Sequence, residues 1–349
     1  MHVGLVIAGD LDTTSGGFYY DRRLLDRLRE RGHEASVVSL PWRSYPRHLL
    51  DNLRRIERRL DEFDVVVEDG LCHPSLLSAN CRLDAPVVAL LHMVWTERES
   101  GVRKRVVRAV ERQYLSGVDA AIYNSEATRE AARRLCHVDD VVARPAGDRF
   151  DPNTTAETIR KRATDGPLKI AFLGAVSERK GLDTLVDGLA DVAAEWRLDV
   201  IGDPDVDPAY ATRVERRIVD AGVADRVRLE GHLDDDDVAD RLREAHVLAV
   251  PSRYEPFGIV YLEAMRFGCV PLATTNGGPP EFIDDGETGV LVEPEDATAI
   301  ATRLERLATN RDRLATLGVA ARHAADRQPT WDETLDRAVD FLEDVCPTT

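Results

Sequence analysis

Two glutamates eight residues apart, Glu255 and Glu263, flank a Pro-Phe-Gly segment that could bind a diphosphate. The apolar run 246–250 predicts a buried strand just before this segment. Pro256 favours a helix that starts near Phe257, because the missing N–H of proline costs nothing in a first turn. The sequence therefore predicts a strand, a polar loop and a helix, with one carboxylate before the helix and one inside it.

The start of this predicted helix offers backbone N–H groups that suit an anion. The amides of Phe257, Gly258 and Ile259 have no partner within the helix, and the helix dipole adds to their attraction. Glu263 lies about six residues into the helix, roughly 9 Å along its axis, and can lean back towards the anion. Two acceptors on either side of a phosphate site match a nucleotide-sugar, which has hydroxyls at both ends and a diphosphate between them.

These residues resemble the signature of the retaining GT-B glycosyltransferases of family 4, in which seven residues separate two glutamates. The resemblance covers most of the second half of the chain and continues more loosely through the first half. It implies an α/β fold in which two Rossmann-like domains with parallel sheets face a cleft. The donor then lies mainly on the second domain and the acceptor mainly on the first. The resemblance also implies that Glu255 contacts the transferred sugar and that Glu263 holds the ribose.

A second candidate segment, 172–189, predicts another strand, loop and helix, with Lys180 just before the helix. A lone lysine is usually a solvated surface residue, but this chain has 42 arginines and only four lysines. The resemblance implies that Lys180 binds the donor diphosphate. The family often has an arginine where this chain has Ala175, and we expect Arg179 or Arg253 to supply the missing charge.

Two candidates follow predicted strands in the first half. Gly16 and Gly17 lie at the turn into the first helix, where paired glycines permit close approach of a phosphate or sugar. A plain turn is the alternative, but the resemblance implies a glycine loop against the donor phosphates. His92 ends the strand 86–92 at the carboxyl edge of a parallel sheet, where ligands bind in open α/β folds. The resemblance implies that His92 reaches the donor sugar, and the alternative is a structural histidine bound to the backbone.

The length of 349 residues predicts two domains. We expect an acceptor-side domain at 1–150, a donor domain at 151–330 and a last helix at 331–349 that packs back on the first domain, as the resemblance implies, with Trp331 as its anchor. Short apolar runs alternate with helical patterns, which indicates βαβ units. The expected strands are 3–9, 34–40, 64–69, 86–92, 120–124, 168–174, 198–202, 227–231, 246–250 and 270–274. The expected helices include 19–31, 47–60, 102–115 and 126–135, with two or three more from about 296 to 346, and 144–166 is expected to connect the domains.

The net charge of −17 comes entirely from residues 151–349, since residues 1–150 carry 23 basic and 23 acidic residues. An acidic surface argues against nucleic-acid binding. Abundant acidic residues with few lysines suggest adaptation to high salt, and a GC-rich genome is the alternative. The five cysteines lack the spacing of a zinc site, so we expect no metal and no cofactor. The chain enters a strand directly, without a signal region or membrane span, which favours a cytoplasmic protein.

Two basic stretches, Arg43–Arg59 and Arg98–Arg112, stand out against the acidic total. The simpler interpretation of each stretch is an amphipathic helix whose charged face is exposed to solvent. The alternative is a face that meets a phosphate-bearing acceptor or an anionic membrane, so that the protein is peripheral to the inner side of that membrane.

The function implied is retaining transfer of a hexosyl group from a UDP- or GDP-sugar to a hydroxyl of a glycan or lipid-linked acceptor, in glycolipid, glycan or polysaccharide synthesis. His92, Glu255 and Lys180 are the expected catalytic residues. A related GT-B phosphorylase or epimerase and a non-catalytic partner subunit are the alternatives. A dinucleotide oxidoreductase fits less well, because no G-x-G-x-x-G follows the first strand.

Overall fold

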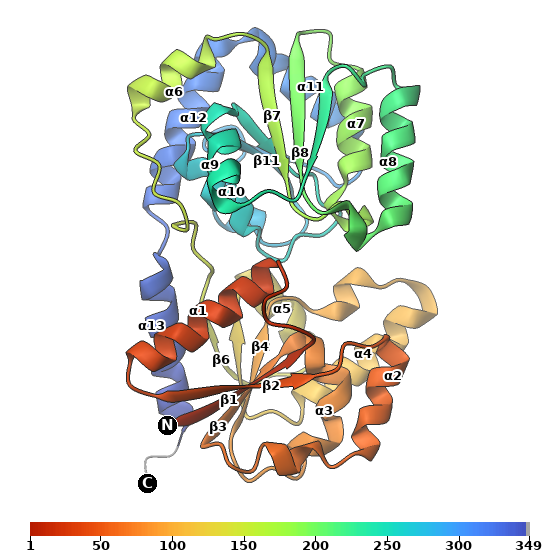
Figure 1. Cartoon of the computed structure of the whole chain (residues 1–349), viewed down its shortest axis with the longest axis vertical. Coiled ribbons are helices and arrows are strands. Elements are labelled where there is room, and N and C mark those ends of the chain that lie inside the picture. The colour runs from red at the N-terminus through yellow and green to blue at the C-terminus, as the bar shows by residue number, and fades with distance from the viewer. Residues whose placement is uncertain (347–349) are drawn as a thin grey trace. The chain divides into compact units, whose positions relative to one another are not determined.

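The computed structural model describes residues 1–346 of the chain. Within them the chain forms two α/β units, and each unit is built on one six-stranded parallel sheet (Figure 1). The first unit comprises Met1–Pro145 and the segment that starts at Thr330, and the second comprises Ala146–Pro329. The α/β fold class predicted from the alternating apolar and helical patterns is confirmed.

The first sheet has the strand order β2-β1-β3-β4-β5-β6. Its strands are β1 (His2–Ala8), β2 (Glu34–Leu40), β3 (Val65–Asp69), β4 (Val87–Leu91), β5 (Ala120–Tyr123) and β6 (Asp139–Val142). Its helices are α1 (Gly16–Glu30), α2 (Tyr45–Leu49), α3 (His73–Asn80), α4 (Gly101–Leu115), α5 (Glu126–Arg133) and α13 (Trp331–Val345). The strands β3 and β4 are buried along their whole length, as is typical of central parallel strands with both faces covered.

The order in which strands are added to this sheet reverses at β1, because β2 lies on one side of β1 and β3 on the other. Parallel connections are right-handed, so the helix after β1 and the helices after β3 cover opposite faces. The loops after β1 and β3 therefore diverge at the carboxyl edge of the sheet. Ligands of open α/β sheets bind at such a switch point.

The last helix, α13, packs on α1 within the first unit (Figure 1). The ring of Trp331 meets the rings of Tyr19 and Tyr20 edge-on, with centroids 5.3 and 5.6 Å apart. Arg27 forms a two-pronged ion pair with Asp336, at 2.8 and 2.6 Å. A helix encoded 300 residues after α1 thus completes the unit that begins the chain.

We expect Trp331→Ala to lower the free energy of unfolding of the first unit by about 3–5 kcal/mol, because the variant leaves a large cavity under α13. Trp331 is fully buried, whereas Trp42 is 62% exposed. The matched control Trp42→Ala should therefore change the free energy by less than about 0.5 kcal/mol. Urea denaturation followed by circular dichroism measures both values, and equal losses would show that α13 contributes nothing through this anchor.

The second sheet has the order β12-β11-β10-β7-β8-β9. Its strands are β7 (Leu168–Leu173), β8 (Trp196–Ile201), β9 (Val227–Gly231), β10 (Val247–Ala249), β11 (Val270–Thr274) and β12 (Val290–Val292). Its helices are α6 (Ala156–Ala163), α7 (Leu182–Ala190), α8 (Pro208–Asp220), α9 (Asp235–Glu244), α10 (Ile259–Arg266), α11 (Ala297–Thr309) and α12 (Arg311–Asp326). The order in which strands are added reverses between β7 and β10. These two strands are paired, so the loops that follow them begin side by side at the carboxyl edge of the sheet.

Three expected features differ from the structure. The predicted helix 47–60 is broken into α2 and two 3-10 turns, at Leu50–Leu53 and Ile56–Arg59. Part of the predicted connection 144–166 is the helix α6, whose buried Ile159 and Ala163 explain why it packs on α12. The units divide at Pro145, ahead of the expected boundary at residue 150.

The division falls there because the first residues after Pro145 pack within the second unit. The ring of Phe150 lies edge-on to that of Phe267, 5.8 Å between centroids. A side chain at Gly147 would collide with Leu262 of α10. In the part of the chain that the structure describes, none of the helices has the length and apolar character needed to cross a bilayer.

Candidate active site

The candidate donor site of the second unit is formed by the loops after β7 and β10. The first loop carries Arg179 and Lys180 in the short 3-10 turn Glu178–Lys180, and the second carries Glu255. The backbone N–H of Arg253 donates to the carbonyl of Arg179 at 2.8 Å, which ties the two loops together. The switch point between β7 and β10 thus brings together residues 75 positions apart.

Lys180 and Glu255 form a buried ion pair. The Nζ atom of Lys180 donates to Oε2 of Glu255 at 2.6 Å, and the same oxygen accepts from the Ser252 hydroxyl at 2.9 Å. Nη1 of Arg179 lies 3.7 Å from the other carboxylate oxygen. Lys180 is 8% exposed and Glu255 5% exposed, so Lys180 is no ordinary surface lysine. Burial raises the pKa of Glu255, but the charges of Lys180 and Arg179 outweigh burial and hold this pKa below its usual value.

The helix α10 begins two residues later than the predicted start at Phe257. Gly258 adopts a left-handed conformation (φ +96°), and this turn delays the helix until Ile259. A Cβ atom at Gly258 would lie 2.5 Å from the Tyr261 ring, so only glycine fits this turn. Among the described residues, no acceptor is recorded for the amides of Phe257, Gly258 and Ile259, as is usual for the first turn of a helix.

Because α10 starts at Ile259, Glu263 lies only about 6 Å along the helix from its first residue, at 1.5 Å per residue, not the roughly 9 Å expected. The carboxylate of Glu263 is 2% exposed, and Nη1 of Arg149 lies 3.7 Å from it. Burial raises the pKa of Glu263 to about 7, even though Arg149 lowers it. Near neutral pH this group can both donate and accept, which suits a pair of hydroxyls.

The two arginines proposed to compensate for Ala175 have different surroundings. The guanidinium of Arg253 contacts Asp183 at 2.9 Å and Glu295 at 3.0 Å, so two carboxylates balance its charge. Arg179 instead lies beside the Lys180–Glu255 pair. Of the two, Arg179 is the better candidate for a phosphate contact.

The first unit brings Gly17 and His92 together. Ser15 caps α1 by accepting from the Phe18 amide, so that Gly16 and Gly17 form the first turn of the helix. A Cβ atom at Gly17 would lie 3.0 Å from the ring of His92. His92 was predicted to end the strand 86–92; in the structure β4 ends at Leu91 and His92 is the first residue after it.

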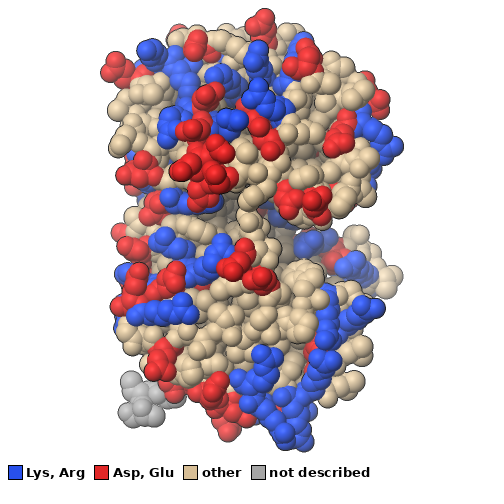
Figure 2. All heavy atoms as spheres, viewed as in Figure 1, with Lys and Arg blue, Asp and Glu red and all other residues tan. Residues whose placement is uncertain are grey.

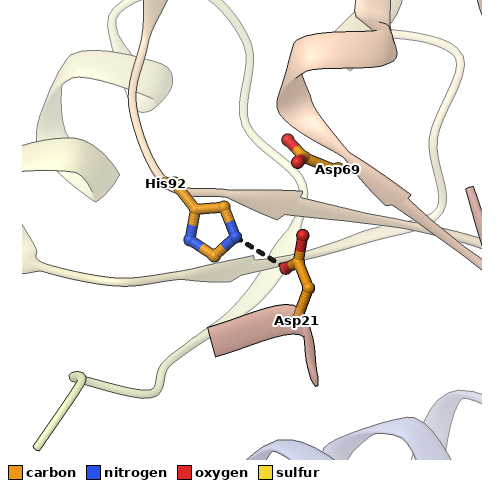
Figure 3. A group of neighbouring side chains, drawn as sticks. All are labelled: Asp21, Asp69 and His92. Atoms are coloured by element: carbon orange, nitrogen blue, oxygen red, sulfur yellow. Dashed lines mark hydrogen bonds and ion pairs between the residues drawn. The ribbon is translucent and has the colours of Figure 1, made fainter. Parts of the chain in front are cut away.

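His92 is held by two polar contacts. Its Nε2 atom lies 2.8 Å from Oδ1 of Asp21, and its carbonyl accepts from the side chain of Asn124 at 2.8 Å. Asp69, the last residue of β3, completes a group in which one ligand atom from each residue lies within 4.8 Å of the others (Figure 3). Sequence reasoning missed Asp21 and Asp69. The available signals were an aspartate on the buried face of α1 and another at the end of an apolar strand.

Comparison with known families agrees with this architecture. The model of the family described as "Glycosyl transferases group 1" matches residues 154–324, and that of "Glycosyltransferase Family 4" matches residues 14–146. D-inositol 3-phosphate glycosyltransferase of Xylanimonas cellulosilytica is 32% identical over 280 residues, which cover 74% of this chain and 66% of that protein. GDP-mannose-dependent alpha-(1-6)-phosphatidylinositol monomannoside mannosyltransferase of Mycobacterium tuberculosis is 31% identical over 256 residues, covering 68% and 65%. The aligned regions thus span slightly less than two thirds of these relatives.

Solved structures share the fold over the whole chain. Sucrose-phosphate synthase from Thermosynechococcus elongatus has a TM-score of 0.84 at 19% identity, covering 98% of both chains. Anabaena HepE in complex with UDP-glucose has a TM-score of 0.80 at 18% identity, covering 99% of this chain and 100% of that one. These likenesses show the GT-B fold. Since the two family models match one unit each and together leave few residues unmatched, the chain belongs to the group 1 glycosyl transferases.

Proposed function

We propose that this protein transfers a hexosyl group from a nucleoside-diphosphate sugar to an acceptor hydroxyl, with retention of the anomeric configuration. The observation that carries the proposal is the buried Lys180 ammonium, which contacts one oxygen of the Glu255 carboxylate while the Arg179 guanidinium lies beside the other oxygen. The unoccupied amides at the start of α10 add donors for an anion. Family membership and the names of the relatives support the same activity.

The leaving diphosphate needs this arrangement. Negative charge grows on it as the glycosyl–oxygen bond breaks, and fixed positive groups in a water-poor site stabilise that charge without reorganisation. Lys180 and Arg179 supply full charges, and the amides of Phe257, Gly258 and Ile259 supply the positive end of a helix dipole. No metal ion is needed for this role, and we keep the prediction that the reaction uses none.

Retention requires attack on the face from which the leaving group departs, or two successive inversions. Glu255 is a poor candidate for a covalent nucleophile, because its carboxylate is engaged by Lys180 and Ser252 and its pKa is low. We therefore favour a displacement on one face that is assisted by the leaving phosphate, with Glu255 holding the sugar. In this reaction Glu263 of α10 holds the ribose.

The donor and the acceptor are proposed from the names of related proteins. One relative is named for GDP-mannose, and HepE was solved with UDP-glucose, so a GDP- or UDP-sugar is the proposed donor. The relatives are named for inositol 3-phosphate and for a phosphatidylinositol monomannoside. A glycan or lipid-linked polyol is accordingly the proposed acceptor.

A thermal-shift screen of UDP, GDP and ADP, alone and as sugars, tests the donor site first. We expect one base to raise the melting temperature clearly above the others. Release of the free diphosphate only in the presence of acceptor then identifies a transferase. Release with phosphate alone would indicate a phosphorylase, and nucleotide binding without any turnover would indicate a non-catalytic subunit.

We also propose that a basic face of the first unit, defined by Arg43–Arg59 and Arg98–Arg112, contacts anionic lipid. Lys and Arg side chains gather on this part of the surface, over α2 and α4 (Figures 1 and 2). The broken helix leaves Leu53 85% exposed, and Val102 of α4 is 76% exposed. Basic side chains around exposed apolar ones suit a membrane interface.

Charge reversal of three arginines on this face should weaken binding to anionic vesicles by roughly 10²-fold, since each basic group contributes about 1 kcal/mol at such a surface. The variant is Arg55→Glu, Arg58→Glu and Arg59→Glu. The control reverses exposed arginines of the second unit, Arg197→Glu, Arg216→Glu and Arg327→Glu. Co-sedimentation with phosphatidylglycerol vesicles at fixed ionic strength measures both. Equal binding by the two variants would show that the basic face is only the solvated surface of its helices.

A further inference from the structure

Asp21, Asp69 and His92 form a cluster that the proposed reaction does not yet use. They come from three elements, α1, the end of β3 and the residue after β4, which the switch point at β1 brings to one place (Figure 3). In Figure 3 one ring nitrogen of His92 points at Asp21, and the other, Nδ1, points away from both carboxyl groups. The cluster therefore has an inner side that carries the two carboxyl groups and an outer side that presents the Nδ1 atom of His92.

The inner side holds two buried carboxyl groups. Asp21 is fully buried and Asp69 is 1% exposed. Oδ1 of Asp69 accepts from the Leu71 amide at 2.8 Å, while one oxygen of each carboxyl group, Oδ2, has no partner within the described residues. In residues 1–346 neither aspartate forms an ion pair with a lysine or arginine, so His92 is the one recorded cation against two acids.

Two buried carboxylates and one imidazolium cannot all be charged at low cost. Burial and the charge of Asp21 raise the pKa of Asp69 to about 7, although His92 and the Leu71 amide lower it. Burial lowers the pKa of His92, but Asp21 and Asp69 outweigh burial and raise this pKa above its usual value. The cluster thus favours a protonated Asp69 and a charged His92 near neutral pH.

The other titratable groups around the cluster add no positive charge. Burial raises the pKa of Cys72 and of Tyr20, whose ring lies 5.3 Å from that of His92. It also raises the pKa of Tyr114 and, to about 7, that of Glu68 on the other side of β3. None of these neighbours therefore brings a positive charge to the cluster.

A metal ion is the other occupant to consider, since three donor atoms lie within 4.8 Å. Zinc with bonds of about 2.0–2.2 Å in a tetrahedral site separates its ligand atoms by about 3.4 Å. His92 Nε2 and Asp21 Oδ1 are 2.8 Å apart, which is the length of a charge-assisted hydrogen bond. The geometry favours a proton over a metal ion.

We propose that Asp21 and Asp69 hold one proton between them, chiefly on Asp69, and that the resulting single negative charge keeps His92 doubly protonated. Nε2–H then donates to Asp21, and Nδ1–H is left as a fixed, charged donor on the outer side of the cluster. Asp21 and Asp69 are positioning residues, because they act on a ligand only through His92. The consequence for catalysis rests on the proposed function, together with the expectation from the sequence that His92 reaches the donor sugar. The proposed protonation states do not depend on that function.

NMR of the free protein tests the protonation states directly. With ¹⁵N-labelled histidine we expect His92 to be an imidazolium at pH 7 and its signals to shift in a second step near pH 7, where Asp69 ionises. Asp69→Asn should abolish that step, and Asp21→Asn should make His92 lose its proton at lower pH than in the wild type. Glu68→Gln, which alters a buried acid of β3 outside the cluster, is the matched control and should leave the His92 titration unchanged.

Three results would overturn the proposal. They are a neutral His92 at pH 7, an Asp69→Asn titration identical to the wild type, and a stoichiometric shift of the His92 signals on addition of Zn²⁺, which would assign the cluster to a metal. For catalysis, Asp21→Asn should lower kcat by roughly 10- to 100-fold with a smaller change in KM, as displaced catalytic groups do. A protein without any transferase activity would refute the proposed function and leave the NMR result standing.

Discussion

Lys180→Met is expected to reduce kcat for sugar transfer by about 10²- to 10³-fold, the loss typical of removing one electrostatic stabiliser of a developing anion. The ammonium is 8% exposed, so water cannot replace it, and Arg179 lies on the other oxygen of Glu255. Methionine keeps most of the side-chain volume and removes only the charge. Initial rates of nucleoside-diphosphate release at saturating donor and acceptor give the value.

Stability must be separated from chemistry in this variant, because Lys180→Met leaves Glu255 buried without its partner. Breaking a buried ion pair on one side costs about 3–5 kcal/mol. The double variant Lys180→Met, Glu255→Gln removes both charges and should recover most of the unfolding free energy while remaining inactive. Lys169→Met, on β7 at an exposed ion pair with Glu244 of α9, is the control and should affect neither property. A double variant that regains activity would show that Lys180 only neutralises Glu255.

The sequence predicts the fold well because the strands that position the site are buried on both faces. Runs such as 87–91 and 247–250 contain no polar residue, and central strands of a parallel sheet are the environment that buries such runs on both faces. β6 and β12 were not predicted, since they are short and β6 is partly exposed, and their pattern does not differ from that of a loop. The prediction of one helix at 47–60 was wrong for another reason. The apolar residues of this segment have helical spacing, but only Ile56 and Leu60 are buried in the core, and Leu53 is exposed to solvent.

The site was only partly predictable. Glu255, Lys180 and the helix after Pro256 could be found because strand, loop and helix are local patterns. The Lys180–Glu255 contact depends on the pairing of β7 with β10, and no local pattern encodes that strand order. The links from His92 to Asp21 and Asp69 likewise depend on the order of β1, β3 and β4. Long-range pairs of this kind are decided by topology, so the sequence suggests the residues and the fold decides which of them meet.

Glu255→Gln is expected to reduce transfer by at least about 10²-fold while the affinity for the nucleoside diphosphate is retained or increases. The amide keeps the shape of the side chain and its bond to the Ser252 hydroxyl, but it removes the charge that neutralises Lys180. Burial lowers the pKa of Lys180 and Glu255 raises it, so in the variant the diphosphate takes the place of Glu255 in keeping the ammonium charged and should bind at least as tightly. Calorimetric titration with the diphosphate and turnover assays on the same preparation separate the two effects.

Glu263→Gln is the matched variant on α10, and it should weaken nucleotide binding more than it slows turnover at saturating donor. Glu263 lies inside the helix beside Arg149, and Glu255 is the glutamate that contacts the Lys180 ammonium. Because the pKa of Glu263 is about 7, its carboxyl group suits hydroxyl groups more than a developing charge. If Glu255→Gln weakens nucleotide binding and leaves transfer intact while Glu263→Gln does the opposite, the two glutamates have the reverse of the roles assigned here. The diphosphate would then have to lie on the other side of the α10 N-terminus.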